Sequence, residues 1–196
     1  EILPIKTYQK LGADPLETIT SAFSKIKEYG EGAALQVVLR PDGEDIRKRA
    51  HGAAKKIKEG GSRKEALGKS GFWAAFKEII KGPSGKKNSS FHDEELAKLF
   101  EEKAGKVIFE CNIRIISSAK TAAETDAILN GLGASFLQFQ NPEGNSLRVR
   151  ELGGSKLRKM IERFSFRMFD EKTSIRLNVE EIASIYHFPY SKKAAP

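Results

Sequence analysis

Apolar residues recur along this chain at two spacings. A spacing of three to four residues predicts helices, and a spacing of two residues predicts strands. Helices are predicted at 15–29, 44–58, 93–103, 121–132 and 155–163, and a short capped helix is predicted after Asn178. Strands are predicted at 33–40, 106–117, 136–139, 164–169 and 173–177, with an edge strand at 1–8. The alternation is clearest in 106–117, because Phe109 and Cys111 face one way while Ile108 and Glu110 face the other.

Local signals support several of these helices. Asp14 is placed to cap the helix that begins at residue 15. Thr121 and Glu124 have the spacing of a capping box, and so do Asn178 and Glu181. The acidic residues also lie at the positive end of the helix dipole, where negative charge is stabilised. The sequence therefore predicts a firmly fixed start for the terminal helix.

The order helix–strand–helix occurs twice, at 15–58 and at 93–132. We therefore predict an α+β fold in which one antiparallel sheet has helices packed on one face and the chain forms two ferredoxin-like halves. The halves are expected at 1–61 and 91–190 of a single domain spanning 1–196. A flexible basic linker, 62–90, is expected between them, because 82–90 is rich in Gly, Ser and Lys. The aromatic run at 72–80 suits a short amphipathic helix within this linker.

Composition limits the classes of protein that fit. Hydrophobic residues make up 39% and charged residues 31% of the 196 residues, as in a globular protein with its own core. No apolar run approaches the roughly 18 to 20 residues that a membrane-spanning helix needs. The single cysteine, Cys111, excludes an internal disulfide and a cysteine-based zinc site, and is interpreted as a small buried hydrophobe.

Positive charge is concentrated in one region. Residues 47–87 contain thirteen Lys or Arg and three acids, while the whole chain has a net charge of +8. Such a region, with aromatic residues inside it, is typical of a surface that contacts nucleic acid or an anionic membrane. The alternative is that the aromatic residues pack on the core and the lysines keep the surface soluble. The candidate contact residues are Arg47, Lys48, Lys55, Lys56, Lys58, Arg63, Lys64, Lys69, Trp73, Lys86 and Lys87.

No motif predicts catalysis. The sequence around Lys69 looks like the end of a phosphate-binding loop, but Arg63 stands where that loop requires its first glycine. The three histidines, His51, His92 and His187, are scattered and lack metal-ligand spacing. We therefore expect no catalytic, cofactor-binding or metal-binding residue in this chain and do not expect it to be an enzyme.

Several stretches together resemble one family. They are 11–16 (LGADPL), 32–37 (GAALQV), Arg40-Pro41, 109–114 (FECNIR), 164–167 (FSFR) and, above all, 177–183 (LNVEEIA) with 186–189 (YHFP). They resemble the domain that precedes the motor in type IV secretion (conjugation-type) DNA-translocating ATPases, notably those of candidate-phylum bacteria. The last two stretches form the most specific part of the resemblance. In that family they lie just before the linker to the ATPase core.

The resemblance implies a non-catalytic accessory domain that positions or oligomerises the motor in the cytoplasm, at the inner face of the cytoplasmic membrane. ATP and Mg²⁺ would then be bound only by an ATPase domain after Pro196, and 191–196 would begin the tether to it. The expected partners are proteins of the secretion or conjugation machinery and DNA, with homo-oligomerisation through the motor. The alternative is a stand-alone nucleic-acid-binding module that uses the basic region 47–87.

Overall fold

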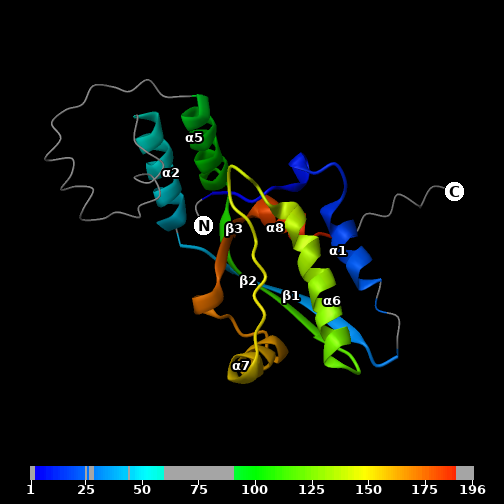
Figure 1. The fold of residues 1–196 in the computed structure, drawn as a ribbon. Coiled ribbons are helices and arrows are strands. Elements are labelled where there is room, and N and C mark those ends of the chain that lie inside the picture. The colour runs from blue at the N-terminus through cyan, green and yellow to red at the C-terminus, as the bar shows by residue number, and fades with distance from the viewer. Residues whose placement is uncertain (1–2, 25, 27–28, 44, 60–90, 189–196) are drawn as a thin grey trace, which may run out of the picture.

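Three antiparallel strands form the sheet around which the chain is arranged (Figure 1). The structure is a computed structural model that describes residues 3–24, 26, 29–43, 45–59 and 91–188. The central strand, β2 (Ile108–Ser118), pairs with β1 (Gly32–Pro41) on one side and with β3 (Ile175–Asn178) on the other. The predicted α+β class and the antiparallel sheet are therefore confirmed.

The described helices begin close to the predicted positions. They are α1 (Pro15–Phe23), α2 (Asp45–Lys58), α5 (Phe91–Ala104), α6 (Ala122–Ser135), α7 (Gly154–Ser165) and α8 (Val179–Ile185). Three short 3-10 helices lie at Tyr8–Lys10, Phe136–Phe139 and Glu171–Thr173. The Asp14 side chain accepts from the Leu16 N–H, and both predicted capping boxes form, at Thr121 and at Asn178.

The two faces of β2 differ in chemistry, as its alternation predicts. Phe109, Cys111, Ile113 and Ile115 face a core that they share with buried side chains of α1, α8 and the 3-10 helix at 136–139, and α6 packs on the same strand. Side chains of α2 and α5 form a second core at the end of the sheet, where the two helices lie side by side (Figure 1).

Three predicted strands are wrong, and each error has a local cause. Residues 136–139 form a 3-10 helix, which buries Phe136 and Phe139 on one side because three residues make one turn. Residues 164–169 instead end α7 in a turn, with Arg167 at a φ of 53°. The described part of 1–8 does not join the sheet, because the Ile5 N–H donates to the Glu181 side chain and the Lys6 N–H donates to the Phe139 carbonyl.

The two ferredoxin-like halves are not confirmed. β1 belongs to the first predicted half and β2 to the second, yet they pair from Gly32–Ser118 to Pro41–Phe109. Likewise, α2 of the first half packs against α5 of the second. Helix α1 ends at Phe23 instead of near residue 29. The predicted linker 62–90, its short helix at 72–80 and the predicted tether 191–196 lie outside the described residues.

A buried ion pair joins four segments of the chain. The Lys103 and Glu181 side chains contact each other, and their side chains are only 1% and 0% exposed. Lys103 Nζ also donates to the Arg176 carbonyl at 2.8 Å. The Glu181 carboxylate accepts from the Ile5 N–H at 2.8 Å and from the Asn178 N–H at 2.6 Å. The pair thus connects the N-terminal segment, α5, β3 and α8.

We predict that Glu181→Gln destabilises the fold strongly. The amide has almost the same size as the carboxylate, but it removes the negative charge that the buried Lys103 contacts, and breaking a buried pair in this way costs about 3–5 kcal/mol. Urea unfolding followed by circular dichroism measures the loss. The matched control is Glu180→Gln, because Glu180 pairs with Lys106 where both side chains are partly exposed, 21% and 27%. That change should cost about 0–1 kcal/mol, so equal losses in the two variants would contradict the role given to Glu181.

Candidate functional site

Helix α2 carries the described part of the predicted contact surface. Ile46, Ala50, Ala53, Ala54 and Ile57 are buried, whereas positions 47–49, 51, 52, 55, 56 and 58 of this helix face solvent. The exposed cations are Arg47, Lys48, Arg49, Lys55, Lys56 and Lys58. Five of these are predicted contact residues, whereas Arg49 is an addition. The other predicted contact residues, Arg63, Lys64, Lys69, Trp73, Lys86 and Lys87, lie outside the described residues.

Neighbouring acidic side chains and a backbone carbonyl contact some of these cations. Lys58 Nζ is 2.5 Å from Glu101 Oε1 of α5, and Lys55 Nζ is 3.9 Å from Glu59 Oε1. Arg47 Nε donates to the Ala104 carbonyl at 3.3 Å. The two lysine ion pairs are at the surface, where ion pairs contribute little and can be exchanged for phosphate oxygens. The α2 cations can therefore attract a polyanion, but nothing in their arrangement selects one base sequence.

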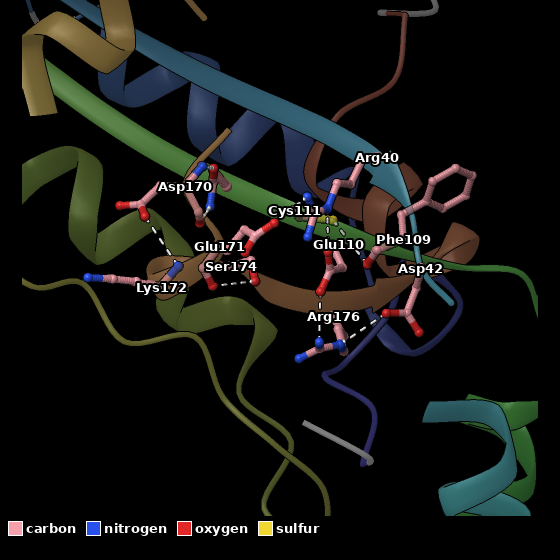
Figure 2. A network of polar contacts seen from close by, with 11 residues as sticks. Arg40, Asp42, Phe109, Glu110, Cys111, Asp170, Glu171, Lys172, Ser174 and Arg176 are labelled. Carbon is pink, nitrogen blue, oxygen red and sulfur yellow. Dashed lines mark hydrogen bonds and ion pairs between the residues drawn. The ribbon is translucent and has the colours of Figure 1, made fainter. Parts of the chain in front are cut away.

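A row of alternating charges crosses the other face of the sheet (Figure 2). Arg40 of β1, Glu110 of β2 and Arg176 of β3 are cross-strand neighbours. Glu110 accepts from both arginines, at 2.5 Å from Arg40 Nε and 2.7 Å from Arg176 Nη2. Arg176 also donates to Asp42 at 3.1 Å, and Arg40 to Glu171 at 3.0 Å. The side-chain hydrogen bond to Glu110 is the main cause that raises the pKa of Arg40.

Arg114 extends this polar face along β2. Its guanidinium donates to Gln36 Oε1 at 2.9 Å and to the Met168 carbonyl at 2.6 Å. Burial lowers the pKa of Arg114, because the charged form loses hydration. Asn112 Nδ2 donates to the Asp170 carbonyl at 2.9 Å, and the Asp170 N–H donates back to Asn112 Oδ1 at 2.6 Å. These bonds hold the segment after α7 against the sheet, so their role is structural.

The sequence carried a signal for this polar face that our prediction did not use. Glu110, Asn112 and Arg114 alternate with apolar residues on the predicted central strand. All three are buried in the structure. A central strand with a polar face needs partners for that face, because a buried polar group without a hydrogen bond costs free energy. The partners themselves come from residues 36–40 and 163–176, which a local pattern does not identify.

The candidate catalytic and metal-binding residues do not gather in the described part of the chain. His51 is exposed on α2, and His92 lies in α5. His187 Nε2 is 3.2 Å from Asp14 Oδ1, and its Nδ1 is 2.9 Å from the Ala183 carbonyl. Among the described residues, no three His, Cys, Asp or Glu side chains are grouped to hold a metal ion. No described helix has the length and apolar character needed to cross a membrane.

Cys111 is buried on the apolar face of β2, as predicted. Burial raises the pKa of its thiol to about 12, because the thiolate would lose hydration there. The thiol is therefore protonated at neutral pH, and it lacks the thiolate form that acts as a nucleophile.

Comparison with known proteins places the chain in a family. No curated protein and no solved structure matches it. The model of the family described as "Domain of unknown function (DUF8128)" matches residues 1–196. Because this match spans the whole sequence, the chain belongs to the DUF8128 family.

Proposed function

We propose that the chain is a non-catalytic accessory domain of a type IV secretion (conjugation-type) ATPase. It would position or oligomerise the motor in the cytoplasm, at the inner face of the cytoplasmic membrane. The observation that carries this proposal is that the described parts of the stretches resembling that family contact one another in space, although they are spread from residue 11 to residue 188 of the sequence.

The contacts among these stretches are specific. His187, in the YHFP stretch, lies 3.2 Å from Asp14 in the LGADPL stretch. Arg40 pairs with Glu110 of the FECNIR stretch. Gln36 of the GAALQV stretch accepts from Arg114 at 2.9 Å and donates to the Phe164 carbonyl at 2.9 Å. The resemblance therefore falls on residues that build one connected framework, which supports a shared fold more than scattered matches would.

The end of the framework also suits a protein contact. Tyr186 and Phe188 follow α8, and they are 54% and 86% exposed. Their ring centroids lie 6.4 Å apart. Exposed aromatic pairs are typical of surfaces that become buried in a complex. We assign this pair to the contact with the motor or with a neighbouring subunit.

The proposal places this chain within a longer protein, and the test uses that protein. We expect it to carry a Walker A motif after Pro196, to hydrolyse ATP and to oligomerise, whereas the 196-residue chain alone releases no phosphate from ATP. Tyr186→Ala with Phe188→Ala should reduce oligomerisation, measured by analytical ultracentrifugation, without lowering the melting temperature. Tyr29→Ala is the control, because Tyr29 is fully exposed elsewhere on the chain. A longer protein without a Walker A motif, or ATP hydrolysis by this chain, would contradict the proposal.

The second candidate, a nucleic-acid-binding module, is favoured by the exposed cations of α2. Fluorescence anisotropy with a 20-nucleotide single strand and the matching duplex should show binding that weakens steeply between 50 and 200 mM salt, because bound cations release counterions from the phosphates. Reversing Lys55, Lys56 and Lys58 to Glu should weaken binding roughly tenfold or more. The control reverses Lys156, Arg158 and Lys159, which are exposed on α7 and change the net charge equally. Equal losses in both variants, or no binding, would remove α2 as the contact surface.

A further inference from the structure

The free edge of β1 lies beside a groove. β1 is the first strand in the sheet order, so only one of its edges pairs with β2. A groove of about 820 Å³ runs along residues 35–39 of the strand. Its lining also includes Leu16, Ile19, Thr20 and Phe23 of α1, together with Phe164, Arg167 and Tyr186.

The register shows which backbone groups of β1 face this groove. Asp42 lies opposite Ile108, one pair beyond Pro41 and Phe109, and the Asp42 N–H donates to the Ile108 carbonyl at 3.2 Å. In an antiparallel ladder, hydrogen-bonded and non-bonded pairs alternate, so the even-numbered residues of β1 bond to β2. The odd-numbered residues, Ala33, Leu35, Val37 and Leu39, therefore direct their N–H and C=O groups toward the free edge.

These edge-facing groups are available for pairing. Within the described ranges of the chain, no backbone or side-chain hydrogen bond reaches the N–H or C=O groups of Leu35, Val37 and Leu39. A row of such groups at a sheet edge is a template for another strand. The groove gives this template a defined position beside α1.

The two walls of the groove differ in chemistry. The side chains of Leu35, Val37 and Leu39 share a face with Cys111 and Ile113 of β2, so they lie on the same side of the sheet as α1 and its apolar residues. The opposite face presents Gln36 and Val38 and, from the turn after α7, the exposed Arg167, which is the one cation among the lining residues. An added strand would therefore place alternate side chains against an apolar wall and against a mixed wall that carries one arginine.

We propose that this groove binds an extended peptide segment of a partner protein as a fourth strand of the sheet, paired antiparallel to β1. Apolar side chains at alternate positions of the peptide pack against α1, and an acidic side chain between them pairs with Arg167. Main-chain hydrogen bonds provide the affinity, while the two walls select the alternating sequence. The inference goes beyond the proposed function, because it holds whether or not an ATPase domain follows the chain.

The probe is an acetylated eight-residue peptide of alternating Val and Glu with a fluorescent label. We expect anisotropy to show binding, and nuclear magnetic resonance to show shifts at the amides of Leu35, Val37 and Leu39. A peptide with the same composition in two blocks, four Val and then four Glu, should bind at least tenfold more weakly.

In an antiparallel pair the Val residues lie opposite Leu35, Val37 and Leu39, so their N–H groups face β1. N-methylation of the Val residues should therefore abolish binding, and N-methylation of the Glu residues should not.

Variants of the chain complete the test. Val37→Pro removes one edge-facing N–H, a change that an edge strand can accept, and should weaken binding tenfold or more. Arg167→Glu should weaken it roughly threefold to tenfold, in the range of an exposed charge pair. Arg158→Glu, with the same charge change on α7, should leave it unaltered. Binding that is insensitive to the N-methylation pattern would overturn the proposal. So would self-association of the chain through β1 that Val37→Pro abolishes, because the edge would then bind a second copy.

Discussion

The contact between Lys103 and Glu181 is the constraint on which the rest of the structure depends. Both charges are buried away from water. Such a pair is stable only when further hydrogen bonds satisfy the remaining donors of the lysine and the remaining acceptors of the carboxylate. Here these bonds come from backbone groups of two other segments, at Ile5 near the N-terminus and at Arg176 and Asn178 in β3. The N-terminal segment, β3 and the start of α8 must therefore take their places together with α5. An ion pair that is costly in isolation thus gives this arrangement its specificity.

The two faces of the sheet and its free edge have different roles in the structure. The apolar face of β2 builds the core with α1, α6 and α8. The opposite face is occupied by the charges around Glu110 and by Arg114, which hold the segment after α7. Because these polar groups bond to one another, they are parts of the framework. Within the described part of the chain, the exposed cations of α2, the aromatic pair after α8 and the groove beside β1 are the surfaces that we propose for partners.

Much of the local structure could be predicted from sequence, because its causes are local. The capping boxes at Thr121 and Asn178 and the alternation of β2 depend on residues only a few positions apart. The sequence predicted Glu181 as a capping residue, but its burial against Lys103 depends on a contact across 78 positions. Residues 164–169 alternate like a strand, yet their carbonyls bond to the side chains of Gln36 and Arg114. The basic region was evident from charge alone, whereas the contact of Lys58 with Glu101 of α5 was not.

The most direct test of this account is a double-mutant cycle on the central pair. Lys103→Met, Glu181→Met and the double variant would be compared by urea unfolding. Each single change removes one member of the buried pair and leaves the other charge in place, whereas the double change removes both charges. We expect the double variant to lose less stability than the two single variants together, by about 1–3 kcal/mol. Strictly additive losses would show that Lys103 and Glu181 do not stabilise each other, and would contradict the central role given to their contact.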